Sequence, residues 1–146
     1  MNILIINGPN LNLLGTREPD IYGKYSYKDL EHALKKHARQ LNVTVDIHQT
    51  NFEGIIIDLL HYAITKPYHG IILNAAALSH YSYAIYDAIK AISIPVINVH
   101  LTNPNNRKEV FRHNDVIKDA CLKTFKGEGI QSYLNAMSFL HKESIV

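Results

Sequence analysis

The sequence predicts an α/β protein in which a parallel β-sheet lies between two layers of helices. Short apolar runs alternate with longer segments whose apolar residues recur at helical spacing, in units of about 25 residues. Strands that alternate with helices in this way are joined by right-handed crossovers into a parallel sheet. The first run, rich in isoleucine, suits a strand buried on both faces. We therefore expect a flavodoxin-like three-layer sandwich with a five-stranded parallel sheet.

The first elements follow from local pattern. Residues 2–7, NILIIN, indicate a buried strand. Residues 26–42 indicate a helix, because Ser26 and Asp29 have the spacing of a capping box and apolar residues follow every three or four positions. Residues 43–49 alternate apolar and polar side chains, which is typical of a half-exposed strand.

The middle of the chain repeats the same alternation. A helix is predicted over 52–65, where Pro67 and Gly70 end the pattern. Buried strands are predicted at 70–74 and 95–101, separated by a helix over 82–93.

The last third is less regular. A polar stretch, TNPNNRKEVFRHND, follows the fourth strand. Residues 120–125 form a weaker strand pattern, and apolar residues at helical spacing from 130 to 140 indicate a closing helix.

Composition restricts the function classes. The 146 residues suit one domain, residues 1–146, with 15 basic and 13 acidic side chains and a net charge of +2. No basic stripe indicates a nucleic-acid partner, and no apolar run approaches the roughly 20 residues that cross a membrane. The single cysteine, Cys121, excludes an intrachain disulfide and is expected in the core. Without a signal peptide, the chain is expected to be cytoplasmic.

Polar side chains gather where the predicted strands end. Ligands of open parallel sheets bind beyond the carboxyl ends of the strands, so these residues are expected to share one edge. An asparagine after a strand is more often a turn residue, and only the co-location favours a site. The polar side chains in these positions are Asn7, Asn10, Gln49, Asn51, Asn74, Ser79, His80, His100, Thr102, Arg107 and Arg112.

Known cofactor motifs are missing from the sequence. It contains no G-x-x-x-x-G-K-[ST], no G-x-G-x-x-G after the first strand and no H-E-x-x-H. The sequence therefore offers no motif that supports a bound nucleotide or a metal ion.

The loop after the first strand, NGPNLNLLGTREPDIYG, is too interrupted for a helix and too polar for a strand. Four blocks of the chain, in order, resemble the type II 3-dehydroquinate dehydratases. They are this loop, QTNFEGIIIDLLHYA, GIILNAAALSHYSYAIYDAI and PVINVHLTN followed by FRH. The resemblance implies conversion of 3-dehydroquinate to 3-dehydroshikimate and water through an enolate, in shikimate biosynthesis or quinate breakdown. It also implies a ring-shaped homododecamer built of trimers, with no metal and no cofactor.

The resemblance assigns the chemistry to four residues. Tyr22 would be the base, and because a phenol has an unperturbed pKa near ~10, its anion needs stabilisation, which Arg17 would supply. Glycines in the loop at about 10–24 would let it close over the substrate as a lid. Asn10 would hold a water on the enolate oxygen, and His100 would be the acid for the departing C1 hydroxyl.

The resemblance assigns substrate binding to a second group. The ring hydroxyls and the carboxylate would be held by Asn74, His80, Thr102, Arg112 and the backbone of Leu101. Asp87 matches a position that reaches the site of a neighbouring subunit. Arg112 is placed by its FRH context, because its block is one residue longer than the family's usual block.

Three departures from the family pattern are present. Residues 74–77 read Asn-Ala-Ala-Ala where the family usually has Asn-Pro-Gly-Ala, and Tyr86 replaces a usual arginine. Asn98 replaces a usual glutamate two residues before His100, so His100 is expected to lack a charged partner. Because of these departures, a second hypothesis is that the chain is a catalytically weak relative that binds a quinate-like carboxylate as a regulatory or scaffold protein. A flavodoxin-like nucleotide binder is a third hypothesis, disfavoured by the missing phosphate motif.

Overall fold

Five parallel strands form one sheet in the order β2-β1-β3-β4-β5 in the computed structural model, which describes residues 1–145. The predicted fold class is confirmed. The strands are β1 (Asn2–Asn7), β2 (Thr44–Gln49), β3 (Gly70–Asn74), β4 (Val96–His100) and β5 (Lys123–Lys126). The helices are α1 (Pro19–Tyr22), α2 (Tyr27–Gln40), α3 (Glu53–Ile64), α4 (Tyr83–Lys90) and α5 (Ile130–Ile145).

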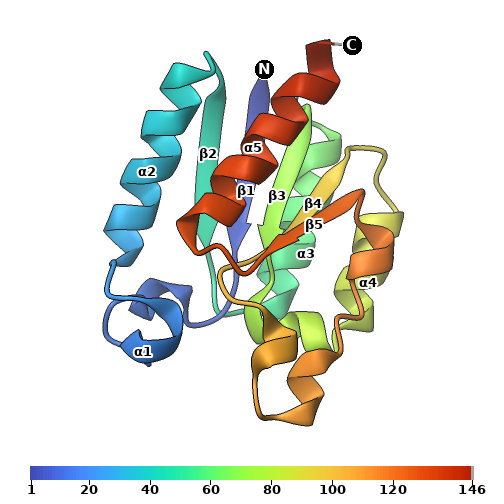
Figure 1. The fold of residues 1–146 in the computed structure, drawn as a ribbon. Helices are drawn as coiled ribbons and strands as arrows, with labels where there is room; N and C mark the ends of the chain where they lie inside the picture. Colours follow the sequence, from blue (N-terminus) through green and yellow to red (C-terminus); the bar gives the residue numbers. More distant parts are fainter. Residues whose placement is uncertain (146) are drawn as a thin grey trace.

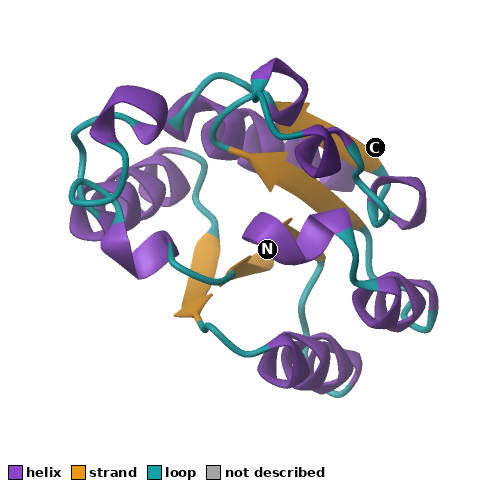
Figure 2. Cartoon of the chain, turned by 90° about the horizontal axis from the view of Figure 1, so that it is seen from below, coloured by secondary structure: helices purple, strands orange, loops and turns teal. Residues whose placement is uncertain are grey.

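Helices cover both faces of the sheet, α2 and α5 on one and α3 and α4 on the other (Figure 1; Figure 2 looks onto the end of the sheet). The period of two in β1 divides its side chains between the two cores. Ile3 and Ile5 pack with α2 and α5, whereas Leu4 and Ile6 pack with α3 and α4. All four are fully buried, which explains the uninterrupted apolar run in the sequence.

Element boundaries agree with the sequence except near α4 and β5. Helix α4 ends at Lys90 rather than 93, and β5 begins at Lys123 rather than at 120. Ala120 and Cys121 lie just before β5 and pack against the core on the α4 side. Their apolar character therefore reflects a packed turn, and the expectation that Cys121 lies on a strand is wrong.

The start of α2 confirms the predicted capping box. The Ser26 N–H donates to Asp29 Oδ2 at 2.8 Å, and the Asp29 N–H donates to Ser26 Oγ at 3.1 Å. These bonds satisfy two amide groups that the first helical turn leaves without partners.

Residues 10–24 form a compact excursion between β1 and α2. The expectation that this segment is too interrupted for a helix is wrong, because it contains a 3-10 turn (Leu11–Leu13) and the one-turn helix α1. Pro19 occupies the first helical position of α1, where its missing N–H costs nothing. Gly23, with φ of 87°, ends the turn in a conformation that favours glycine.

The chain reverses its direction across the sheet between β1 and β3, where an open sheet leaves a crevice. Asn7 and Asn74 are paired in register at the carboxyl ends of these strands. Gly8 then passes so close to β3 that a Cβ would lie 2.7 Å from the Ala75 carbonyl oxygen. Only glycine fits there, and the close approach brings residues 10–24 to the ends of β3 and β4.

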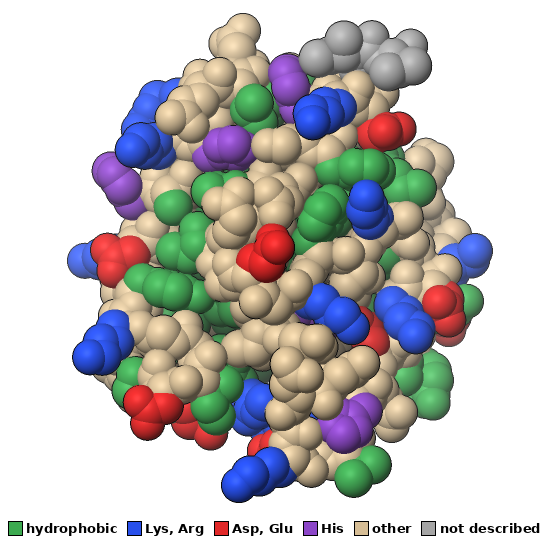
Figure 3. Space-filling view, in the orientation of Figure 1, with side chains coloured by type: hydrophobic (Ala, Val, Ile, Leu, Met, Phe, Trp, Pro, Cys, Tyr) green, Lys and Arg blue, Asp and Glu red, His purple; other side chains and the backbone are tan. Residues whose placement is uncertain are grey.

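The outer surface carries mixed charges. On the face shown in Figure 3, basic side chains are interspersed with acidic ones. Within the described residues, no helix combines the length and apolar character needed to cross a bilayer.

Candidate active site

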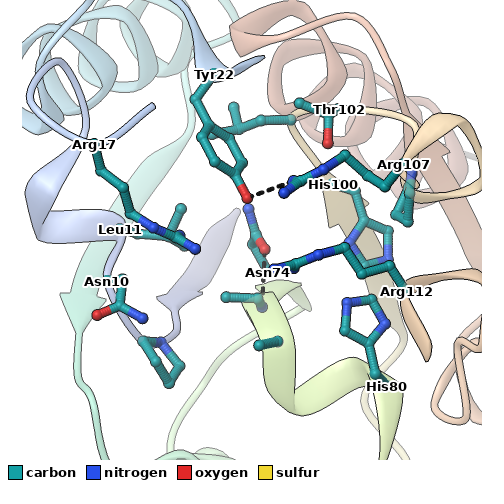
Figure 4. A pocket seen from close by; sticks show the side chains of 15 residues that line it. Asn10, Leu11, Arg17, Tyr22, Asn74, His80, His100, Thr102, Arg107 and Arg112 are labelled. Carbon is teal, nitrogen blue, oxygen red and sulfur yellow. Dashed lines mark hydrogen bonds between the residues drawn. The ribbon is translucent and has the colours of Figure 1, made fainter. Parts of the chain in front are cut away.

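One pocket lies at the carboxyl edge of the sheet, between residues 10–24 and the loop after β4 (Figure 4). Its empty space, including the open mouth, is about 550 Å³. The residues to which the resemblance assigns a role all line it, except Asp87. Among the other polar residues at the strand ends, Arg107 lines it, whereas Asn7, Gln49, Asn51 and Ser79 do not. The lining residues are Pro9, Asn10, Leu11, Arg17, Tyr22, Asn74, Ala76, Ala77, His80, His100, Leu101, Thr102, Pro104, Arg107 and Arg112.

Tyr22 is held by two arginines. Its hydroxyl oxygen accepts a hydrogen bond from Arg107 Nη1 at 2.9 Å (Figure 4). The guanidinium carbons of Arg17 and Arg107 lie 5.2 Å and 5.5 Å from the centre of its ring, within cation–π range. Arg107 also approaches Glu18, at 4.0 Å, and Glu109, at 3.6 Å. A phenolate at Tyr22 would therefore face two cations.

These contacts stabilise the charged form of Arg107. Burial opposes its charged form, but the hydrogen bond to Tyr22 and the carboxylates of Glu109 and Glu18 outweigh burial and raise the pKa of Arg107. Its side chain is only 10% exposed. The guanidinium is thus a fixed positive charge beside the phenol oxygen.

His100 ends β4 and is nearly buried, with 6% of its surface exposed. Its Nε2 lies 2.9 Å from Asp115 Oδ2, and the amide of Asn98 donates to the same oxygen at 2.7 Å. The expectation that His100 lacks a charged partner is therefore wrong. The carboxylate comes from the loop after the fourth strand rather than from β4 itself.

His80 is positioned by the same loop. Its Nδ1–H donates to the Asn114 carbonyl oxygen at 2.7 Å, and its ring stands edge-on to Phe111. Burial lowers the pKa of His80, and the Asn114 hydrogen bond offsets this only in part. His80 is accordingly neutral at neutral pH, and its Nε2 is free to accept a hydrogen bond from a hydroxyl.

A buried network fixes the floor of the pocket. The Tyr133 hydroxyl donates to Asn7 Oδ1 at 2.7 Å and accepts from Asn74 Nδ2 at 2.8 Å. Burial raises the pKa of Tyr133, which keeps it a neutral donor. The Asn74 Oδ1 accepts from the Ala76 N–H at 3.1 Å, which shapes the turn after β3.

Ala76 shows the consequence of one departure from the family pattern. Its φ is +52°, in the left-handed region that the family's usual glycine adopts without strain. The turn keeps the shape that glycine favours, although an alanine occupies it. The backbone beside the substrate pocket is therefore strained at this position.

Three guanidinium groups give the pocket a positive character. Arg17, Arg107 and Arg112 line it. Glu109 forms ion pairs with two of them, its Oε1 lying 3.2 Å from Arg112 Nε and 3.6 Å from Arg107 Nη2. The planar guanidinium pairs well with a carboxylate, so the pocket suits a small anionic ligand.

The remaining predicted residues divide between pocket and surface. The Asn10 N–H donates to Asn51 Oδ1 at 3.0 Å, and the Asn10 side chain reaches the pocket. Leu101 and Thr102 form the wall directly after β4. Asp87 lies on the exposed side of α4 and does not line the pocket of its own chain.

Two site residues received no role from the sequence. Arg107 was identified only as a polar residue after β4, and its position at the Tyr22 oxygen depends on the fold of two separate loops. Asp115 stands three residues after Arg112, but no sequence pattern pairs it with His100. The only sequence feature that could have indicated a second acid near His100 is the asparagine at position 98, where the family usually has a glutamate.

The fold and the site together define an α/β protein with a cationic pocket that offers a tyrosine and a histidine for acid–base chemistry on a small carboxylate. Comparison with known proteins is consistent with this class. The family described as Dehydroquinase class II matches residues 1–141, and the chain belongs to that family.

Individual relatives match nearly the whole chain. Proteins named 3-dehydroquinate dehydratase from Caldicellulosiruptor bescii and Caldicellulosiruptor saccharolyticus are 50% and 51% identical over 135 residues, 92% of each chain. The crystal structure of a type II dehydroquinase from Butyrivibrio crossotus superposes with a TM-score of 0.94 at 42% identity, covering 96% of this chain and 97% of that one.

Proposed function

We propose that this chain catalyses the dehydration of 3-dehydroquinate to 3-dehydroshikimate, without a metal or cofactor. The observation that carries the proposal is a tyrosine hydrogen-bonded to an arginine, in the same pocket as a histidine backed by a carboxylate. A base and an acid in one pocket suit removal of a proton from one carbon and of a hydroxyl from its neighbour. The relatives named 3-dehydroquinate dehydratase support the same reaction.

In the proposed mechanism, the Tyr22 phenolate removes a proton from the carbon next to the ketone. Arg107 and Arg17 stabilise the phenolate by their positive charge. Asn10 holds a water that supports the enolate oxygen. When the C1–oxygen bond breaks, His100 protonates the departing oxygen, and water is released.

The substrate would be held by the rest of the pocket. The carboxylate suits a guanidinium such as Arg112. The neutral His80 accepts from a ring hydroxyl through Nε2, because its Nδ1 is occupied by Asn114. The other proposed binding groups are Asn74, Thr102 and the backbone of Leu101.

The whole chain, residues 1–146, would act as one catalytic domain, with residues 10–24 as a lid. In its present position, the lid is attached to the loop after β4 through the contacts of Arg107 with Tyr22 and Glu18. Release of these contacts would open the pocket, and their re-formation would exclude water during the reaction.

The proposed assembly is a cytoplasmic homododecamer of trimers. The exposure of Asp87 on α4, away from its own pocket, agrees with a role at the site of a neighbouring subunit. Light scattering tests the assembly, because a fully active monomer would contradict both the dodecamer and the role of Asp87.

A direct assay tests the activity. The purified protein is mixed with 3-dehydroquinate, and the ultraviolet absorbance of the conjugated enone product is followed. Tyr22→Phe should lower kcat by several orders of magnitude and still bind a product-like ligand. An absence of product at high enzyme concentration would contradict the proposal and favour the binding-only relative.

A further inference from the structure

The carboxylate beside His100 comes from an unexpected part of the chain. Asp115 follows the short 3-10 helix Val110–His113, and its Oδ2 lies 2.9 Å from His100 Nε2. The two side chains are 16% and 7% exposed, so water screens the pair poorly. This is the one ion-pair geometry that involves His100 within the described residues.

Asn98 occupies the position where the family usually has an acid. Its Nδ2 lies 3.4 Å from His100 Nε2, donates to Asp115 Oδ2 at 2.7 Å and also reaches Thr124 Oγ1 at 3.3 Å. An acid at 98 would approach the same ring nitrogen that Asp115 contacts here. The chain thus holds an amide at 98 and an acid at 115, both within reach of one imidazole nitrogen.

We propose that Asp115 is the residue that orients His100 and holds its Nε2 proton during dehydration, in place of the acid missing at position 98. Asp115 is a positioning residue, since it touches His100 and does not line the pocket. The proposal rests on the proposed function, in which His100 is the acid.

The electrostatics of the pair agree with this role. Burial tends to raise the pKa of Asp115, but the hydrogen bond and charge of His100, with the Asn98 amide, outweigh burial and lower it. Asp115 is therefore ionised at neutral pH. A carboxylate at 2.9 Å can accept the Nε2–H of His100 and fix the orientation of its ring.

Other charged groups face the pair from three directions. His80, from the turn after β3, is neutral at neutral pH because burial lowers its pKa, and Arg112, from the loop after β4, is the cation that acts on His80 together with His100 and Asp115. Cys121 lies near Asp115, but burial and the Asp115 charge raise the pKa of its thiol to about 12, so it adds no charge at neutral pH. Asp115 is thus the carboxylate in direct contact with His100.

The geometry also selects the nitrogen that transfers the proton. With Nε2–H donated to Asp115, the remaining ring nitrogen is Nδ1. The Nδ1 proton moves to the C1 oxygen as the C1–oxygen bond breaks with its electron pair on oxygen, which leaves as water. The imidazole then remains neutral with its Nε2–H on Asp115, as in other carboxylate–histidine pairs that fix one tautomer.

An exchange of the two side chains tests the proposal. Asp115→Asn is nearly isosteric, removes the charge and should lower kcat about ten- to a hundredfold with little change in KM. The double variant Asn98→Asp, Asp115→Asn returns a carboxylate to within about the 3.4 Å that now separates Asn98 from His100, and should recover most of kcat. Asp119→Asn, an exposed acid nearby, is the matched control and should leave kcat unchanged.

Each outcome has a defined meaning. The proposal would be overturned by a normal kcat in Asp115→Asn, or by a kcat in the exchange variant as low as that of Asp115→Asn. If Asp115 served only in packing, kcat would not recover when the carboxylate is moved to position 98.

A measurement of the His100 tautomer distinguishes a failure of this proposal from a failure of the proposed function. The ¹⁵N shifts of His100 report which ring nitrogen carries the proton, with or without turnover. The proton should favour Nε2 in the unaltered protein and lose that preference in Asp115→Asn. An unaltered protein that shows this tautomer but does not convert 3-dehydroquinate would refute the function and retain the pair, whereas an active protein with unchanged shifts in Asp115→Asn would refute the pair alone.

Discussion

Replacement of Arg107 by alanine should slow the reaction by removing the hydrogen bond that the tyrosine oxygen receives. Arg107 Nη1 lies 2.9 Å from the Tyr22 oxygen, and its side chain is 10% exposed. Because the reacting base is the phenolate, the variant loses a hydrogen bond that stabilises its negative charge. The alanine variant should therefore lose activity without losing its fold.

The magnitude follows from the contacts. A hydrogen bond to a charged group contributes about 1.5–3 kcal/mol. The pair between Arg107 and Glu18, at 4.0 Å with Glu18 45% exposed, adds less than about 1 kcal/mol after screening by solvent. Since about 1.4 kcal/mol of activation free energy corresponds to a tenfold change in rate, kcat/KM should fall roughly 10- to 150-fold.

The assay is the formation of the conjugated enone from 3-dehydroquinate, measured for single and double variants. Arg107→Ala should cost little more once Tyr22→Phe has removed the oxygen, because both changes act on the same bond. Arg39→Ala, an exposed arginine on α2, controls for the loss of positive charge and should leave the rate unchanged. If the losses from the Arg107 and Tyr22 changes multiply, Arg107 does not act through the tyrosine oxygen.

Three further predictions concern stability and reactivity. Tyr133→Phe leaves two buried amides without their partner and should lower the free energy of unfolding, measured in urea, by about 1–3 kcal/mol. Tyr81→Phe changes an exposed ring and should have little effect, and equal effects of the two changes would contradict the role of the network. Ala76→Gly should raise the free energy of unfolding by roughly 0.5–1 kcal/mol, because glycine removes the strain of the left-handed backbone. Ala77→Gly should not raise it. A lower free energy of unfolding in Ala76→Gly would show that the backbone at this position is unstrained. Burial raises the pKa of Cys121 from 9.0 to about 12, so its thiolate fraction at pH 8 is about a thousandfold smaller than in the unfolded chain, and alkylation should be slower by roughly that factor. The rate should rise with pH, and alkylation as fast as in the unfolded chain would contradict the burial.

The sequence predicted the sheet because its signals are local. The isoleucine-rich run of β1 and the capping box of Ser26 and Asp29 are set by neighbouring residues, and both have the expected structure. The pattern was less informative at β5, where Ala120 and Cys121 are apolar because they pack beside α4 and not because they extend a strand. Local pattern does not distinguish these two reasons for burial.

The sequence also placed most of the site, because residues that end parallel strands converge on one edge whatever the details of packing. Asn74, His80 and His100 share a pocket for this reason. Tertiary structure alone decided which charges meet. Arg107 reaches the Tyr22 oxygen and Asp115 reaches His100 because loops distant in sequence fold over the same edge, and such contacts depend on distances of a few ångströms that no spacing along the chain encodes.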